Sequence, residues 1–104
     1  MITASFSKRN GKFNKFCISG HSGYAPEGSD IVCASVSSMT VMTINNITES
    51  FGLPAEVKVE EESVTIACTL LTEDEVGIKL VQGLYNELCI LQGDYPKYIK
   101  VITE

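Results

Sequence analysis

Apolar and polar residues alternate over five short stretches of the chain, and a period of two is typical of β-strands with one buried face. These stretches are residues 1–7, 12–19, 55–60, 63–70 and 97–104. Between the first two, Asn10-Gly11 is a strong hairpin signal, because both residues tolerate positive φ. A simple two-residue hairpin would place Phe16 on the face opposite Phe6. We therefore expect either a longer or bulged loop, or a ribbon that is partly covered on both faces.

Two longer stretches indicate helices. Residues 31–50 follow Ser29 and Asp30, both good N-cap residues, and stop before Gly52 and Pro54. The stretch is apolar over most of its girth and has no Lys or Arg, which predicts a largely buried helix. Its predicted core stripe comprises Val32, Val36, Met39 and Ile47.

A second helix is expected to start at Thr72, with Glu75 completing a capping box, and to end at Gly93. Its predicted core stripe comprises Val76, Leu80, Leu84 and Leu88. The element order is therefore β-β-α-β-β-α-β, which predicts a two-layer α/β sandwich of the α+β type. Two helices would cover one face of a five-stranded sheet, and the other face would be exposed or used for self-association. With 104 residues, one domain over 1–104 is the default.

Composition narrows the classes of partner. The net charge of −5 argues against a nucleic-acid binder and would suit a partner with a basic segment. The first thirteen residues are alternating and polar, unlike a secretion signal, and no stretch is expected to reach the length of a membrane span. We therefore expect a cytoplasmic protein without a membrane partner.

Four cysteines, Cys17, Cys33, Cys68 and Cys89, are widely scattered and form no CxxC pair. A disulfide framework or a structural zinc site is a poor interpretation of this spacing, so we expect free thiols. Cys17 and Cys68 fall within strands, and Cys89 lies late in a helix, where the dipole disfavours an anion. These three are expected to be inert packing residues.

Cys33 differs from them, because it lies in the first turn of the predicted helix. Free backbone N–H groups and the positive end of the helix dipole favour a thiolate there, and the thiolate is the reactive form. The only histidine, His21, lies twelve residues earlier, and the glycine-rich loop between them is long enough to bring ring and sulfur together. The same N–H groups could bind the oxyanion of an acyl-transfer intermediate. The alternative is a packed cysteine and a histidine that only ends a strand.

The loop offers further candidates. Asp30 either caps the helix or orients His21, and the cap is the preferred interpretation. The loop residues that could touch a substrate are Gly20, Ser22, Gly23, Tyr24, Gly28 and Ser29, although solvation is the simpler expectation for Ser22, Tyr24 and Ser29. Asp30 could also complete a metal site with His21 and Cys33, but no spacing rule supports it, so we predict no metal and no cofactor.

Together these residues resemble a known family. Gly20-His21-Ser22-Gly23-Tyr24-Ala25, then Gly28, then Asp30-Ile31-Val32-Cys33-Ala34-Ser35-Val36-Ser37, is similar to the signature of the bacterial ribosomal-processing cysteine protease (Prp) family. Gly83-Leu84 and Tyr95-Pro96-Lys97-Tyr98-Ile99 extend the likeness over essentially the whole chain.

The resemblance implies a small dimeric cysteine protease that removes a short N-terminal extension from one large-subunit ribosomal protein. By position, Cys33 matches the nucleophile, His21 its partner, and the loop between them a mobile segment that covers the substrate. Asp30 matches the aspartate of the motif without a firm role. Pro26-Glu27 matches a variable stretch, which gives no information about specificity.

Two other functions stay open from the residues alone. The chain could be a non-catalytic dimeric module that binds or assembles a ribosomal protein, with His21 and Cys33 as packing residues. It could also be a thiol redox sensor that uses Cys33, although no resolving cysteine lies nearby in the sequence.

Overall fold

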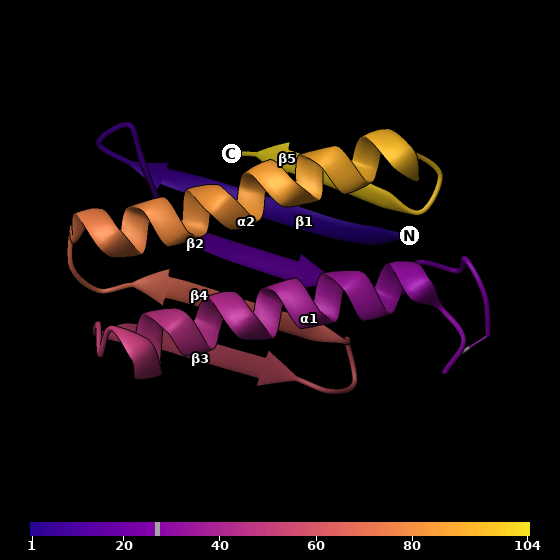
Figure 1. Ribbon diagram of the computed structural model, residues 1–104, viewed down its shortest axis with the longest axis horizontal. Helices are drawn as coiled ribbons and strands as arrows, with labels where there is room; N and C mark the ends of the chain where they lie inside the picture. The colour runs from indigo at the N-terminus through magenta and orange to yellow at the C-terminus, as the bar shows by residue number, and fades with distance from the viewer. Residues whose placement is uncertain (27) are drawn as a thin grey trace.

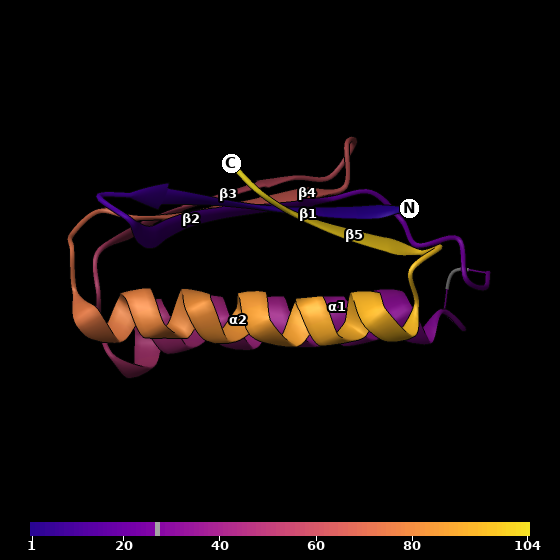
Figure 2. The same ribbon diagram turned by 90° about the horizontal axis from the view of Figure 1, so that it is seen from above.

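The computed structural model describes residues 1–26 and 28–104, and its elements follow the expected order β-β-α-β-β-α-β. The strands are β1 (Ile2–Arg9), β2 (Lys12–Ser19), β3 (Ala55–Glu60), β4 (Thr65–Leu70) and β5 (Ile99–Thr103). The helices are α1 (Ile31–Asn45), continued by a π-helical turn η1 (Asn46–Ser50), and α2 (Glu75–Asp94). Figure 2 shows both helices on one face of the sheet, so the predicted two-layer α+β sandwich is confirmed.

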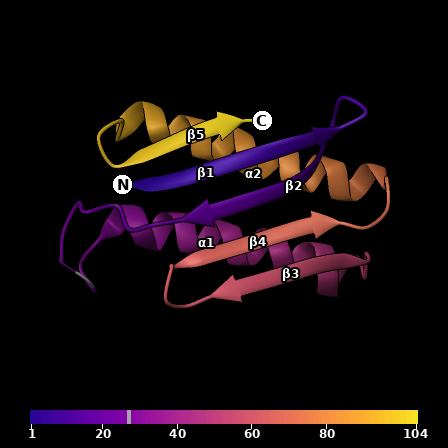
Figure 3. The same ribbon diagram turned by 180° about the vertical axis from the view of Figure 1, so that it is seen from behind.

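The sheet has the order β3-β4-β2-β1-β5, and among the described strands only β1 and β5 pair in parallel (Figure 3). In Figure 1, α2 lies in front of β1 and β2, and α1 lies in front of β4. The chain therefore leaves β2 near the start of α1. There the loop to α1 meets the start of β1 and the turn between β3 and β4.

A β-bulge resolves the question about the first hairpin. Asn10 and Gly11 form the tight turn with φ of 55° and 76°, and Phe6 lies opposite Phe16. The pairing shifts between Ser7 and Lys8, which leaves Asn14 as an extra residue in β2. The bulge turns both aromatic rings toward the helices, where Phe6 and Phe16 are fully buried. The bulged alternative is therefore the correct one.

Helix α1 is buried along one side only, which corrects the expectation of a largely buried helix. The buried side consists of Val32, Val36, Thr40, Thr43 and Ile44, with Ile47 in η1. On the open side, Ile31, Val41 and Met42 are each at least half exposed. Met39 is half-buried and packs at the margin of the core.

The span Ile31–Ser50 is also long and apolar enough to cross a membrane by length and composition, contrary to the expectation that no stretch reaches that length. A core helix meets the same criterion, and one side of this helix packs on the sheet. Length and composition therefore give no independent support for a membrane span here.

Helix α2 starts later than expected, because Asp74 rather than Thr72 is its N-cap. The Asp74 carboxylate accepts hydrogen bonds from the amides of Val76 and Gly77, so the predicted capping box does not form. The buried stripe comprises Gly77, Val81, Leu84 and Leu88, so it agrees with the prediction at Leu84 and Leu88 and lies one residue later at its first two positions. Val76, expected in the core, is 40% exposed. A Cβ at position 77 would lie 3.3 Å from Leu70 Cδ1 in β4, so glycine there lets the helix approach the sheet closely.

Candidate active site

The loop between β2 and α1 begins at a residue that must be glycine. Gly20 has a φ of +91°, and a Cβ there would lie 2.5 Å from the carbonyl oxygen of Met1. Its amide donates a hydrogen bond of 3.1 Å to the carbonyl oxygen of Val64, in the turn between β3 and β4. The close approach fixes His21 beside both the start of β1 and this turn.

A single buried carboxylate, that of Asp30, holds the start of α1 and the loop together. One oxygen, Oδ1, accepts a 2.9 Å hydrogen bond from the Cys33 amide, so the expected N-cap role is confirmed. The other oxygen, Oδ2, accepts from Ser22 Oγ and from the amides of Tyr24 and Ala25 at 3.2 and 3.3 Å. Burial alone would raise the pKa of Asp30, but these hydrogen bonds outweigh it and lower the pKa to about 2. The carboxylate is therefore ionised at neutral pH.

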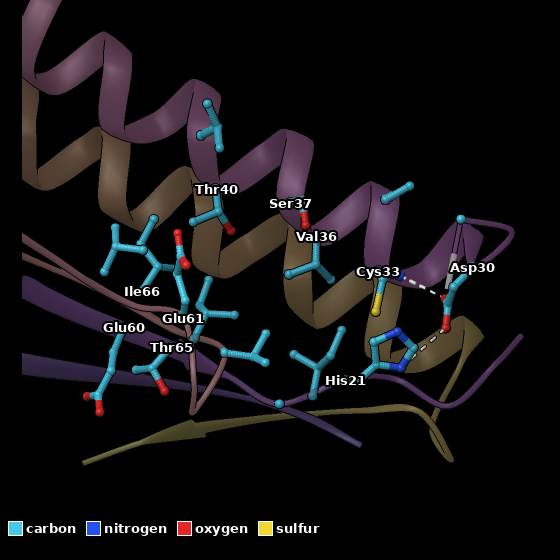
Figure 4. Close-up of a pocket in the computed structure, with 18 residues that line it drawn as sticks. His21, Asp30, Cys33, Val36, Ser37, Thr40, Glu60, Glu61, Thr65 and Ile66 are labelled. Carbon is cyan, nitrogen blue, oxygen red and sulfur yellow. Dashed lines mark hydrogen bonds and ion pairs between the residues drawn. The ribbon is translucent and has the colours of Figure 1, made fainter. Parts of the chain in front are cut away.

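Cys33 and His21 meet across the loop (Figure 4). Cys33 lies half-buried in the first turn of α1, and the Ser22 amide donates a hydrogen bond of 3.3 Å to its sulfur. The imidazole of His21 lies with Nδ1 3.9 Å from Asp30 Oδ2 and accepts a 3.2 Å hydrogen bond from the Gly23 amide through the same nitrogen. Figure 4 shows the other ring nitrogen turned toward the sulfur. The structure thus brings His21 and Cys33 together, as the sequence pattern predicts.

The same three side chains could in principle hold a metal ion. One nitrogen of His21, one oxygen of Asp30 and Cys33 Sγ all lie within 4.8 Å of one another. Both oxygens of Asp30 already accept hydrogen bonds from the chain, four in all with those from Ser22 Oγ and three amides. A metal would have to displace some of these bonds, so the carboxylate is better explained as an anchor for the loop.

The other predicted loop residues play different parts. Gly20 and Gly28 line the hollow beside Cys33, whereas Ser22 is only 3% exposed. The expectation that Ser22 is solvated is therefore wrong, because its hydroxyl is used by Asp30. Ser29 is exposed and closes a turn through its amide and the Pro26 carbonyl oxygen at 2.9 Å. Glu27, in the stretch interpreted as variable, lies outside the described residues.

Tyr24 anchors the far side of the loop, a contact that the sequence pattern did not predict. Its ring packs edge-on against Tyr95 and Tyr98, with centroids 5.5 and 5.1 Å apart. Tyr95 and Tyr98 belong to the second block of the family resemblance, between α2 and β5. In the sequence, this contact is indicated only by the presence of Tyr24 in one block of the family resemblance and of Tyr95 and Tyr98 in the other. The fold shows that the two blocks lie together in space.

A groove of about 580 Å³ runs from Cys33 and His21 along α1. Its helix wall carries Cys33, Ala34, Val36, Ser37, Thr40 and Val41, and its opposite wall carries Val59, Glu60, Glu61, Val64, Thr65 and Ile66. The lining is mainly aliphatic, with acidic groups at the rim. Such a groove can hold an extended peptide across the sulfur. The sequence pattern does not identify the second wall, because strands β3 and β4 come close to Cys33 only through the fold.

Solved structures share this architecture. A structure of the essential ribosomal-processing protease Prp from S. aureus, with a covalently linked product peptide, has a TM-score of 0.94 at 19% identity, over 100% of both chains. The S. aureus protease with a substrate peptide has a TM-score of 0.88 at 18% identity, again over 100% of both chains. SMU.848 from Streptococcus mutans has a TM-score of 0.81 at 24% identity, over 100% of this chain and 96% of the other. At these identities the likeness establishes the fold.

Sequence comparison adds the family. A comparison with curated protein sequences finds no match. The model of the family described as cysteine protease Prp matches residues 1–100, nearly the whole chain, and that match spans the loop, the start of α1 and the contact of Tyr24 with Tyr95 and Tyr98. The chain therefore belongs to the cysteine protease Prp family.

Proposed function

We propose that the chain is a cytoplasmic cysteine endopeptidase that removes the short N-terminal extension of a large-subunit ribosomal protein, with residues 1–104 acting as one protease domain. Cys33 is the nucleophile and His21 its general base. The observation that carries the proposal is the placement of Cys33 Sγ. It lies in the first turn of α1, takes a hydrogen bond from the Ser22 amide, and faces the only imidazole inside an apolar groove. The similar S. aureus protease, bound to substrate and product peptides, supports the choice of substrate.

Each catalytic step follows from this arrangement. To take the proton of the thiol with the nitrogen that faces the sulfur, His21 must carry its own proton on Nδ1, toward Asp30, so the Gly23 amide has to release Nδ1. The thiolate of Cys33 then attacks the scissile carbonyl carbon. The amides of Cys33 and Ala34 already donate to Asp30, so the oxyanion is stabilised by other backbone amides. The imidazolium then gives its proton to the leaving amine, and water hydrolyses the acyl-enzyme to release the second product. Asp30 is a positioning residue in this scheme, because it ties the loop that carries His21 to the helix that carries Cys33.

Substrate binding is expected to close the described part of the loop, residues 20–26 and 28, over the groove. Gly20 and Gly28 line the groove, and Tyr24 holds the loop through its contact with Tyr95 and Tyr98. Structures of the free and the peptide-bound protein test this closure. An identical, already closed loop in both would refute it.

The function is tested by incubating the chain with the extended ribosomal protein and reading the products by mass spectrometry. We expect one cut at the junction of extension and mature protein. Cys33→Ala and His21→Ala should abolish it while the circular dichroism spectrum stays unchanged. If the wild type binds the extended protein without cutting it, the chain is the non-catalytic binding or assembly module.

We also propose a homodimer. On the outer side of the helix layer, Ile31 and Met42 of α1 and Ile90 of α2 are 52%, 60% and 60% exposed, whereas the outward positions of β1 are Thr3, Ser5 and Ser7. The helix layer therefore offers more apolar surface for self-association than the outer face of the sheet does. Light scattering of the wild type and of the double variant Met42→Lys/Ile90→Lys measures the oligomeric state and so tests the proposed dimer. A wild-type monomer would rule out the dimer.

A further inference from the structure

One hydroxyl in α1, that of Thr40, is both buried and unpaired within the described part of the chain, unlike three other hydroxyls in α1 and η1. Ser35, Thr43 and Thr48 each donate a hydrogen bond to the carbonyl oxygen four residues earlier, at 2.8, 2.7 and 2.9 Å. Thr40 does not, and its Oγ1 is a buried side-chain atom without a hydrogen-bond partner among the described residues. Leaving a buried hydroxyl unpaired destabilises a fold. A partner that arrives with a ligand is a physical reason to keep it.

The position of Thr40 indicates which ligand. Thr40 is only 2% exposed and lines the same groove as Cys33, two turns further along the same face of α1. Figure 4 shows Glu61 extending from the opposite wall toward the helix, on the side where Thr40 lies. Glu60 and Glu61 both line this end of the groove, but Glu60 pairs with Thr65 on the outer face of the sheet, and Figure 4 shows its side chain pointing away from Thr40. Neither takes part in an ion pair with any residue that the structure describes.

The charged side chains at this end of the groove, Glu60 and Glu61, are both acidic. His21, at the other end, is the only basic side chain among the described residues of the lining, and the chain as a whole carries a net charge of −5. Backbone strain is concentrated at the same place, because Val64 has a φ of 50°, which is costly for a β-branched residue. The side chain of Val64 is 57% exposed and lines the groove. Aliphatic walls that end in two carboxylates suit a long side chain with a cationic tip.

We propose that the end of the groove formed by Thr40, Glu60, Glu61 and Val64 is a subsite for a lysine or arginine side chain of the substrate. The stem lies against Val64, the cation is held by the Glu61 carboxylate, with Glu60 adding negative charge from the outer face of the sheet, and Thr40 Oγ1 gains a polar partner. This inference rests on the proposed function and adds a requirement for a cation at one position of the cleaved peptide.

The helix geometry gives that position. Thr40 lies seven residues beyond Cys33, which is about 10 Å along the helix axis. An extended peptide advances about 3.3 Å per residue. The cationic residue is therefore about three residues from the scissile bond.

The test uses fluorogenic peptides that span the junction of extension and mature ribosomal protein. The peptides come in pairs that differ at the third residue from the junction, with one pair for each side. One peptide of a pair has lysine at this position and the other has norleucine, which has a similar stem without the charge. For one side of the junction, we expect kcat/KM for wild type to favour lysine about tenfold. In Glu60→Gln/Glu61→Gln the preference should fall to about twofold or less, and Glu61→Lys should favour a glutamate peptide instead.

Glu62→Gln is the matched control, because Glu62 lies in the same turn but does not line the groove. It should keep the full preference for lysine. Thr40→Val keeps the shape of the side chain and removes the hydroxyl. It should reduce the preference for lysine and also raise the melting temperature by about 2–5 °C, because an unpaired buried group is gone. A purely structural Thr40 would leave the preference unchanged.

Binding separates this proposal from the proposed function. Fluorescence anisotropy of the same peptides on Cys33→Ala measures the subsite without turnover. Selective binding of lysine peptides without any cleavage by wild type would support the subsite and overturn the protease assignment. Equal binding and equal cleavage of lysine and norleucine peptides, or a preference that Glu60→Gln/Glu61→Gln retains, would overturn the subsite.

Discussion

At the scale of single residues, Asp30 decides whether the site exists. Its two oxygens serve different segments, because Oδ1 starts α1 at Cys33 and Oδ2 gathers Ser22, Tyr24 and Ala25. The two roles that the sequence allows, helix cap and support for His21, are therefore linked. The cap is direct, and His21 is placed chiefly through the loop that the same carboxylate organises.

Asp30→Asn separates these two roles. Asparagine is as good an N-cap as aspartate, so α1 should still begin at the same place. Its amide nitrogen cannot accept the bonds that Oδ2 takes from Tyr24 and Ala25, so the loop loses its anchor. We expect kcat/KM to fall about tenfold or more, with the far-UV circular dichroism spectrum retained. Wild-type activity would show that the loop needs no anchor.

The same variant has a signature in the pH dependence of stability. The pKa of Asp30 is about 2 in the fold, below the value of about 3.9 for an unfolded aspartate. Ionised Asp30 therefore stabilises the fold above about pH 4, and this contribution is lost as the pH falls toward 2. Urea unfolding at pH 7, 4, 3 and 2 should show a difference between wild type and Asp30→Asn that shrinks at the acidic end. A constant difference would contradict the assignment.

At the scale of elements, local pattern predicts the strands and both helices but not their exact phase. The alternation in β1 and β2 is visible in the sequence, yet only the need to bury Phe6 and Phe16 together hints at an irregular ribbon. The predicted start of α2 is wrong, because Thr72 and Asp74 are both good caps and the choice depends on where the helix meets the sheet. Errors in the start of a helix or in the register of a strand arise because tertiary packing decides between local alternatives, and the local sequence pattern carries no information about that packing.

The bulge gives an element-scale prediction. Deleting Asn14 would restore an even register in β2, so Phe13 and Phe16 could no longer both face the helices. Losing one buried phenylalanine costs about 3–5 kcal/mol, which would unfold much of a chain this small. Urea unfolding monitored by circular dichroism measures the loss. Asn14→Ala keeps the extra residue and should cost about 1 kcal/mol or less, so an equal loss in both variants would mean that the bulge is not what matters.

At the scale of the whole molecule, the fold brings together what the sequence keeps apart. The loop motif and the helix start are local features, so the sequence pattern alone points to Cys33, His21 and Asp30. The strand order, with β4 beside β2, and the turn that forms the second wall of the groove have no such local signature. Those contacts join residues some thirty positions from Cys33, such as Val64, and only the packed sheet brings them to the site.

The difference between the four cysteines is a property of the folded molecule. Cys33 lies at the start of α1 beside an open groove. Cys68 is 1% exposed, and burial raises the pKa of its thiol. Cys17 and Cys89 are half-buried, away from a helix N-terminus. In the native protein at pH 6.5, we expect iodoacetamide to label Cys33 about tenfold faster than any other cysteine, read by peptide mass spectrometry.

Unfolding provides the control for this experiment. In 8 M urea the four cysteines lose their separate surroundings, so their rates should converge to within about twofold. His21→Ala in the native state should slow Cys33 and leave Cys17 and Cys89 unchanged. Native rates that are equal and slow at all four positions would mean that the start of α1 and the imidazole do not activate this sulfur, and the protease mechanism would lose its physical basis.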